Sequence, residues 1–246
     1  MNSVGIIGFG RFGKILSNIL QRGFNVKVYD TRSETTFSNI EFVNLDEIVK
    51  QKNIFISVPI RNFKNIISKI SPKLKNNTVI DVCSVKIEPV KIMKKILPET
   101  VGIIATHPLF GPDSFNINNN LKMMMNNTRD IHHQYKFWKN YFDAQNIQII
   151  EMEPDEHDLL AAKTQGITHF LGRVLKEFGI NKTKIDTQGF SELLDLVKQT
   201  CNDSWELFSD LQLYNPYTNE IINKIKNSTN KISDKLIKEN TDAMEN

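Results

Sequence analysis

Two hydrophobic patterns divide the chain. Over about the first 150 residues, short apolar runs rich in β-branched residues alternate with segments whose apolar positions recur at helical spacing. Strands that alternate with helices form a doubly wound, mostly parallel sheet, so this part is predicted to be an α/β domain. Six runs are predicted as its strands: Val4 to Gly8, Val26 to Asp30, Ile54 to Val58, Thr78 to Val82, Val101 to Ala105 and Ile147 to Ile150.

The second part of the chain follows a helical pattern. From Asp155 onward the strand-like runs disappear, and apolar residues recur every three or four positions. Examples are Leu160, Ile167, Leu171, Val174 and Phe178. The change of pattern at Glu153 and Pro154 predicts two domains, an α/β domain over residues 1–153 and a smaller all-helical domain over residues 154–246.

Composition excludes several classes of protein. The net charge of +3 comes from single lysines scattered along the chain, which is not the basic stripe of a nucleic-acid-binding protein. Apolar runs are too short to span a bilayer, and the first strand begins at Val4, which leaves no room for a signal peptide. Two distant cysteines and five histidines form no metal-ligand cluster. We therefore expect a cytoplasmic protein without nucleic-acid, membrane or metal partners.

A glycine-rich loop, "GFGRFG", directly follows the first predicted strand and opens a helix. Such a loop brings backbone and helix N-terminal amides to a pyrophosphate, so a Rossmann-type dinucleotide site is predicted over an ordinary glycine turn. Asp30 ends the second strand 17 residues later, where a carboxylate accepts a hydrogen bond from a ribose hydroxyl and favours NAD. Arg32 leaves NADP open. The loop's predicted cofactor-binding residues are Gly8, Phe9, Gly10, Arg11, Phe12 and Gly13.

Three further loops follow predicted strands, at the sheet edge where ligands bind in such folds. Val58 and Pro59 are expected to pass over the cofactor. Ser84 can donate a hydrogen bond to a substrate alcohol, and His107, in "ATHPLFGPDS", can accept the alcohol's proton during oxidation. The alternatives are ordinary strand–helix connections and a buried histidine bonded to the backbone.

Polar residues on the first predicted helix of the second domain also mark a candidate site. Asp158, Gln165 and His169 are seven and four positions apart, so on a continuous helix they share one face. That face is either solvated or turned to a cleft, and the small residues between its members favour a cleft. Arg173 flanks the face and can attract a carboxylate.

The segments "DVCSVK", "THPLFGPDS" and "EPDEHDLLAAKTQGITHFLGRVL" together resemble the arogenate/prephenate dehydrogenases of tyrosine biosynthesis. Members of this family transfer hydride from C4 of a cyclohexadienol to NAD or NADP, with loss of the ring carboxylate as carbon dioxide. The resemblance implies that His107 polarises or deprotonates the C4 hydroxyl and that Ser84 bonds the same oxygen. It also implies that Asp113 and His157 belong to a polar network at the mouth of the site, and that the helical domain forms a homodimer.

One departure bears on the substrate. Many bacterial prephenate dehydrogenases carry an Arg on a later helix that binds a substrate carboxylate, whereas residues 188–215 contain no Arg and Lys198 as their only cation. This segment resembles the plant-type arogenate branch, which favours arogenate, whose ammonium Asp158 is expected to meet. Another NAD(P)-dependent dehydrogenase built on the same two-domain plan, or a non-catalytic NAD(H)-binding module, remains as an alternative.

Overall fold

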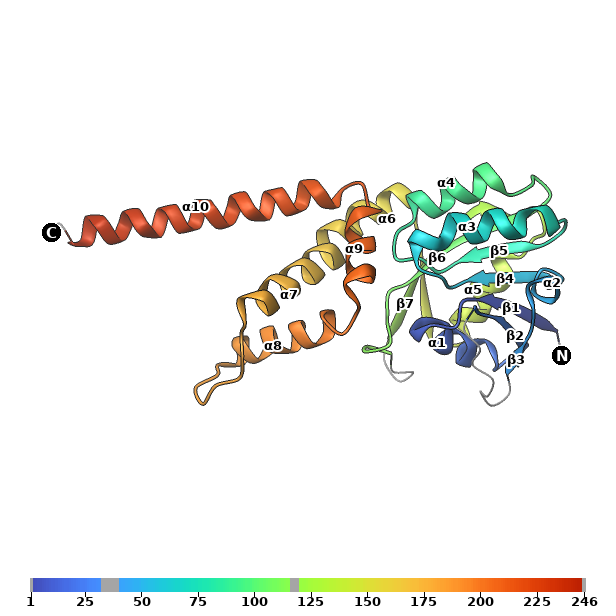
Figure 1. Ribbon diagram of the computed structural model, residues 1–246, viewed down its shortest axis with the longest axis horizontal. Coiled ribbons are helices and arrows are strands. Elements are labelled where there is room, and N and C mark those ends of the chain that lie inside the picture. Colours follow the sequence, from blue (N-terminus) through green and yellow to red (C-terminus); the bar gives the residue numbers. More distant parts are fainter. Residues whose placement is uncertain (1, 32–39, 116–119, 245–246) are drawn as a thin grey trace. The chain divides into compact units, whose positions relative to one another are not determined.

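The computed structural model describes residues 2–31, 40–115 and 120–244. The chain divides into two compact units, Met1–Asp158 and Leu159–Asn246. The first unit is α/β and the second is helical, which confirms the predicted fold class (Figure 1). The division falls five residues after the position at which the sequence pattern changes, because the first turn of helix α6, Pro154–Ala161, packs with the first unit.

A single mixed sheet forms the centre of the first unit. Within the described residues its strand order is β3-β2-β1-β4-β5-β6-β7-β8, and every pair is parallel except β6 and β7. All six predicted strands are present, and β3 and β7 are additional. The strands are β1 Ser3–Ile7, β2 Asn25–Tyr29, β3 Ile40–Phe42, β4 Asn53–Ile56, β5 Thr78–Asp81, β6 Gly102–Pro108, β7 Leu121–Arg129 and β8 Ile147–Glu151.

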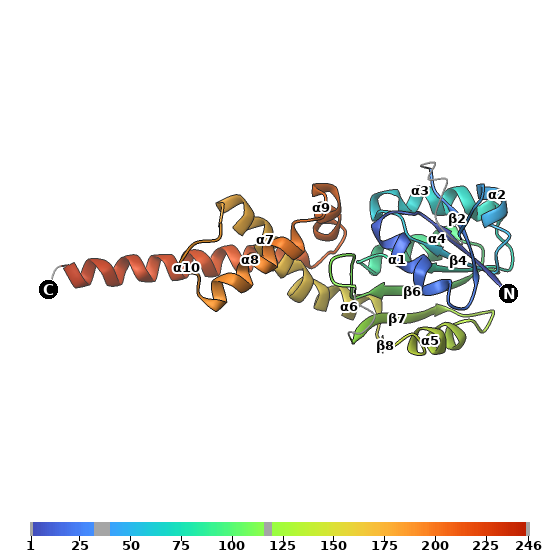
Figure 2. The same ribbon diagram turned by 90° about the horizontal axis from the view of Figure 1, so that it is seen from below.

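Helices cover both faces of this sheet, as its fully buried central strands require. Helices α3 and α4 pack against each other, whereas α1 and α5 lie together on the other face, where the Tyr141 hydroxyl donates to the carbonyl of Ile19 (Figures 1 and 2). The helices of the unit are α1 Arg11–Leu20, α2 Leu45–Ile48, α3 Ile60–Ile70, the short 3₁₀ turn η1 Ser71–Lys73, α4 Ile87–Ile96 and α5 Tyr135–Asp143.

Aromatic side chains fill the core between α5 and the sheet. Trp138 is fully buried, stacks edge-on against Phe55 of β4 with ring centroids 4.8 Å apart, and also packs on Phe24 and Phe142. Its indole N–H donates to the side-chain oxygen of Asn53 at 3.0 Å, so burial leaves no polar atom of the ring unpaired. This core holds the central strands in place, and their carboxyl ends carry the predicted site.

The second unit is a set of helices. After α6 come a π-helical turn, η2 Ala162–Gly166, and the helices α7 Ile167–Phe178, α8 Gln188–Thr200, α9 Trp205–Leu213 and α10 Thr218–Met244. Gly179, at φ 87°, ends α7 in the left-handed conformation that glycine adopts without strain. Thr187 and Ser204 cap α8 and α9 through hydrogen bonds to backbone N–H groups. None of the helices in the described ranges is long and apolar enough to cross a membrane.

Candidate functional site

Two glycines of the glycine-rich loop lie so close to neighbouring backbone atoms that no residue with a side chain can replace them. Gly8 has φ +100°, and a Cβ atom there would lie 2.2 Å from the carbonyl oxygen of Ser57 on the neighbouring strand end. A Cβ atom at Gly13 would lie 2.3 Å from the carbonyl oxygen of Gly8. The loop therefore bends sharply at Gly8 and brings α1 close to β1, which is the geometry that a pyrophosphate-binding turn requires.

The start of α1 also suits an anion. Its N-cap is Gly10, which offers no side-chain cap, and its first turn contains no acidic residue. Helix N-termini carry partial positive charge and point N–H groups outward, so a phosphate placed here is stabilised by both. The glycine-rich turn and this helix start fit the pyrophosphate of a dinucleotide.

Asp30 lies at the glycine loop, directly after β2. Its carboxylate accepts a hydrogen bond of 2.6 Å from the backbone N–H of Phe9. This contact fixes the carboxylate beside the loop, at the position from which the sequence predicts it to reach a ribose. Arg32, the predicted alternative partner for a 2′-phosphate, lies outside the described residues.

Two contacts join the glycine loop to the chain after β6. Arg11 donates two hydrogen bonds, of 2.7 and 2.8 Å, to the carboxylate oxygens of Asp113. Next to this ion pair, the rings of Phe12 and Phe110 pack with centroids 6.1 Å apart. Both bonds come from one guanidinium nitrogen, and an exposed ion pair of this kind contributes little to stability although it links the two loops. The structure thus brings a predicted cofactor residue against a predicted substrate residue.

The remaining predicted residues of the first unit follow neighbouring parallel strands. Val58 and Pro59 follow β4, and Pro59 is the N-cap of α3. Ser84 lies half-buried in the loop between β5 and α4. Because β1, β4, β5 and β6 are parallel, their carboxyl ends bring these loops to one edge of the sheet.

His107 is buried at the carboxyl end of β6, where it pairs with Met124 of β7. Its Nδ1 lies 2.7 Å from Nε2 of His157, and Nδ1 of His157 lies 2.8 Å from Oδ1 of Asp158. Asp158, which is completely buried, also accepts hydrogen bonds from the backbone N–H groups of Lys86 and Ile87, at 2.7 and 2.9 Å. Three side chains that the sequence nominates therefore form one hydrogen-bonded chain.

The order of this chain determines which ring nitrogen carries each proton. Asp158 accepts from two backbone N–H groups, so it also acts as the acceptor for Nδ1–H of His157. Nε2 of His157 then has only a lone pair and accepts Nδ1–H of His107. Nε2 of His107 is left with a lone pair, which is the form required of a proton acceptor.

The surroundings of His107 keep its imidazole neutral. Burial lowers the pKa of His107 well below its usual value of 6.5, and the neighbouring His157 and the positive charge of Lys86 lower it further. The neutral form is consequently the dominant one at physiological pH. A buried neutral imidazole with a free lone pair can accept a proton from an alcohol held beside it.

Two predictions need revision in the light of these contacts. His157 was expected in a network with Asp113, whereas it bonds His107 and Asp158, and Asp113 bonds Arg11. Asp158 was expected on a helix face shared with Gln165 and His169, but the π-helical turn Ala162–Gly166 interrupts the α-helical periodicity on which that expectation relied. Both carboxylate oxygens of Asp158 are engaged, which favours a positioning role over contact with a substrate ammonium.

The predicted polar residues of the second unit include buried atoms that lack partners. Within the described residues, Oε1 of Gln165, Nδ1 of His169, Nε of Arg173 and Oε1 of Gln212 are buried without a hydrogen bond. Burial, followed by the charge of Arg173, lowers the pKa of His169, and Asp203 partly opposes this. Unpaired buried polar atoms are costly in a folded protein and are typical of sites that receive a ligand or water. The sequence identified three of the four residues, and Gln212 was missed.

Sequence reasoning also missed the ion pair between Lys86 and Asp81. Both side chains are completely buried, and the Lys86 ammonium contacts the Asp81 carboxylate and the carbonyl oxygen of Thr106. The only hint in the sequence was a lysine and an aspartate flanking the loop "DVCSVK", directly after a strand of buried residues. A lysine there is ordinarily assumed to be exposed.

Two domain families match parts of the chain. The family described as "Prephenate dehydrogenase, nucleotide-binding domain" matches residues 20–129, and the one described as "TYRAAT1-like, C-terminal domain" matches residues 174–246.

Among curated proteins, arogenate dehydrogenase 1, chloroplastic, from Arabidopsis thaliana is 34% identical over 229 residues, which are 87% of this chain and 36% of the relative. Arogenate dehydrogenase 2, chloroplastic, from the same plant is 30% identical over 237 residues, which are 90% of this chain and 66% of the relative. The chain thus spans about a third and just under two thirds of these two proteins.

Solved structures share the fold. The prephenate dehydrogenase from A. aeolicus, determined with hydroxyphenyl propionate and NAD+, superposes with a TM-score of 0.76 at 20% sequence identity. The superposition covers 97% of this chain and 92% of that one. At this identity the likeness concerns the fold, which both the α/β unit and the helical unit follow.

Proposed function

Because the chain belongs to the arogenate/prephenate dehydrogenase family, we propose that it catalyses the oxidative decarboxylation of arogenate or prephenate with NAD(P)+. The products are tyrosine or 4-hydroxyphenylpyruvate, carbon dioxide and reduced cofactor. The observation that carries this proposal is the hydrogen-bonded chain from Asp158 through His157 to His107, which presents a neutral imidazole at the same sheet edge as the glycine loop.

The residues of the first unit fit a dinucleotide. Gly8 and Gly13 leave room for the pyrophosphate turn, the amides that open α1 face the phosphates, and Asp30 is held beside the loop for a ribose. The carboxylate of Asp30 repels a 2′-phosphate, so we propose NAD as the preferred cofactor. The A. aeolicus prephenate dehydrogenase, whose structure was determined with NAD+, supports this choice. When bound, the nicotinamide supplies the acceptor for the hydride that leaves C4.

The residues of the first unit bind the hydroxyl group at C4 and accept its proton. Nε2 of His107 accepts the hydroxyl proton as the hydride departs, and His157 and Asp158 hold the imidazole in the tautomer that makes this possible. Ser84, which lies half-buried in the loop between β5 and α4, is proposed to donate a hydrogen bond to the same oxygen. As the carboxylate leaves as carbon dioxide, its bonding electrons complete the aromatic ring and the oxygen becomes a phenolate. The proton held at Nε2 of His107 then returns to this oxygen and gives the phenol.

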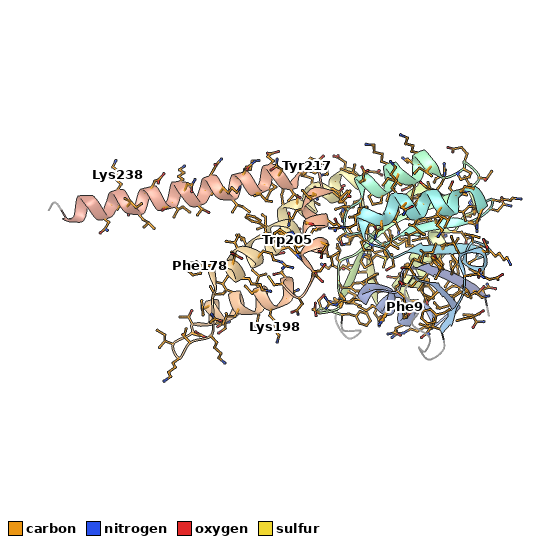
Figure 3. All side chains as sticks on the ribbon, viewed as in Figure 1. Phe9, Phe178, Lys198, Trp205, Tyr217 and Lys238 are labelled. Carbon is orange, nitrogen blue, oxygen red and sulfur yellow. The ribbon has the colours of Figure 1, made fainter. Side chains whose placement is uncertain are left out.

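The second unit is proposed to contain a polar binding site of its own. The unpaired buried atoms of Gln165, His169 and Arg173 offer both donors and an acceptor to a carboxylate-bearing side chain. Residues 188–215 contain no Arg, and Lys198, their only cation, is exposed on α8 (Figure 3). The missing guanidinium favours arogenate over prephenate.

We also propose that α10 pairs with a second copy of the chain. Its later turns extend beyond α7, α8 and α9 in both views (Figures 1 and 2), and Ile232, Leu236 and Ile237 are 62, 61 and 63% exposed there. Leu236 and Ile237 lie four and five positions after Ile232, so the three apolar residues form a stripe that a homodimer would bury. Light scattering should give twice the monomer mass, and Ile232→Glu together with Leu236→Glu should give the monomer. A wild-type monomer at micromolar concentration would contradict this.

The location in the cell remains a prediction. The sequence suggests the cytoplasm, and among the described residues neither Cys83 nor Cys201 forms a disulfide, as is usual in a reducing compartment. The names of the two plant relatives assign those proteins to the chloroplast.

The decisive experiment mixes the protein with NAD+ or NADP+ and with arogenate or prephenate, in four combinations, and follows the absorbance of the reduced nicotinamide. We expect the highest kcat/KM with NAD+ and arogenate. His107→Asn serves as the catalytic control, because it should abolish most of the signal without unfolding the protein. Cofactor binding without turnover in any combination would overturn the proposed activity in favour of a non-catalytic NAD(H)-binding module.

A further inference from the structure

Lys86 has an unusual place for a lysine. It is completely buried, and its ammonium group contacts the carboxylate of Asp81 at the end of β5 and the carbonyl oxygen of Thr106 on β6. The next residue after Thr106 is His107. The Thr106 hydroxyl, in turn, donates to the backbone carbonyl of Asp81 at 2.6 Å, so the two strand ends are tied together from both sides.

The backbone of the same lysine reaches the other end of the histidine chain. The N–H of Lys86 donates to Oδ1 of Asp158 at 2.7 Å, and this same oxygen receives Nδ1 of His157. Lys86 therefore contacts both ends of the hydrogen-bonded series His107–His157–Asp158. Its ammonium lies beside the strand that carries His107, and its backbone N–H bonds the carboxylate that orients His157.

We propose that Lys86 is a positioning residue that fixes His107 for proton acceptance and, through its buried positive charge, keeps that imidazole in the proton-accepting form. The part of this role that concerns proton acceptance from a substrate rests on the proposed function. The electrostatic influence on His107 does not, since it follows from the arrangement of charges in the folded chain.

The charged and titratable groups near His107 support this role. His157, from α6, contacts the ring directly and is itself bonded to Asp158. Lys86 approaches from the β5–α4 loop with Asp81 as its counter-ion, and β7 presents the uncharged Met124 beside His107. Burial is the largest cause of the lowered pKa of His107, and the charges of His157 and Lys86 follow. Of these groups, Lys86 is the one whose ammonium can be removed by substitution without changing either histidine.

An ammonium group suits this place for a further reason. Burying a lysine is costly unless acceptors surround its ammonium, and here a carboxylate and a main-chain carbonyl do so. Burial raises the pKa of Asp81, and the adjacent ammonium of Lys86 opposes that rise. A neutral side chain of the same length would leave the Thr106 carbonyl without this donor.

The test is an NMR titration of His107 in the protein without ligands. Imidazole signals are followed from pH 8 downward in the wild type and in Lys86→Met, and His107→Asn identifies the His107 signal. Loss of the nearby positive charge should raise the titration midpoint of His107 by about one pH unit or more. Lys91→Met, which makes the same change at an exposed position on α4, should leave the midpoint unchanged.

A second variant keeps the test valid if Lys86→Met unfolds because the buried Asp81 carboxylate has lost its ammonium partner. Lys86→Met combined with Asp81→Asn removes both charges, an exchange that buried ion pairs often tolerate. The midpoint should again rise, by less than in Lys86→Met, because the positive charge that lowers the pKa of His107 is removed together with its counter-ion. An unchanged midpoint in either folded variant would overturn the proposal.

Kinetics separate this inference from the proposed function. If the wild type turns over its substrate, the acid limb of kcat/KM should move to higher pH in the Lys86 variant, while KM at high pH changes little. A shifted NMR midpoint with no wild-type turnover would refute the proposed activity alone and leave the electrostatic role intact. Turnover with an unshifted midpoint and an unshifted acid limb would refute the role of Lys86 alone.

Discussion

Replacing His107 by asparagine tests the proposed chemistry most directly. Asparagine can still donate a hydrogen bond toward Nε2 of His157, and it can accept one from a substrate hydroxyl, but it cannot take up a proton. Binding of cofactor and substrate should therefore be nearly normal. The defect should fall on the chemical step, so kcat should drop while KM changes little.

The size of the drop follows from the role. A single positioned base contributes roughly two to four orders of magnitude in rate, or about 2.7 to 5.4 kcal/mol of transition-state stabilisation. His107 should lie toward the upper part of this range. Burial and the nearby charges lower its pKa, so almost all of the wild-type enzyme is in the active protonation state at pH 7. The bonded His157 and Asp158 also hold the ring in one tautomer, so little of the effect is lost to misorientation.

The assay follows reduced nicotinamide at saturating substrate over pH 5 to 9. The wild-type rate should fall only at pH values below 6.5, since a lowered pKa delays protonation of the imidazole, and this limb should be absent from His107→Asn. His133→Asn is a matched control. It makes the same exchange at an exposed position whose φ of 52° asparagine adopts readily.

A particular result would refute the reasoning. If folded His107→Asn turned over at close to the wild-type rate with the wild-type pH profile, this histidine would be structural and the proton acceptor would lie elsewhere, with His157 the next candidate. A drop in the rate of His133→Asn of the same size would show that the assay responds to general damage.

Three other predictions concern the cofactor and stability. Gly10→Val should weaken NAD binding, measured by calorimetry, with the fold retained, because a branched side chain would stand at the phosphate-binding turn. Asp30→Ala should raise kcat/KM with NADP+ relative to NAD+, and an unchanged ratio would argue against a ribose contact. The lowered pKa values of His107 and His169 should make the free energy of unfolding fall as the pH drops below 6.5, because the unfolded chain binds more protons. Urea unfolding of wild type and His107→Asn should show a smaller loss in the variant.

The fold was largely predictable because its central strands are short, apolar and β-branched. The two strands that sequence reasoning missed lack these features. β3 has only three residues, at the edge of the sheet, and β7, "LKMMMNNTR", is rich in methionine and asparagine, which show no preference for strands. β7 forms because it pairs with β6 on one side and β8 on the other, a gain that depends on distant parts of the chain.

The candidate site divides in a similar way. Gly8, Gly13 and Asp30 were predictable because a local turn and a fixed spacing specify them. The hydrogen bond from Lys86 to Asp158 joins residues 72 positions apart, so no local pattern indicates it. The π-helical turn at Ala162–Gly166 has no clear signature in the sequence either, and it defeats any argument from uninterrupted helical spacing.

Asp158 contributes both to the stability of the fold and to the candidate site. Catalytic groups commonly weaken a fold, because they are buried or strained for the sake of chemistry. Here the Asp158 carboxylate accepts hydrogen bonds from two N–H groups at the start of α4, which caps this helix. The same carboxylate bonds Nδ1 of His157 and so orients the two histidines. A substitution at Asp158 would therefore remove hydrogen bonds from the start of α4 and from His157 together, so fold stability and the proposed activity both favour an aspartate at this position.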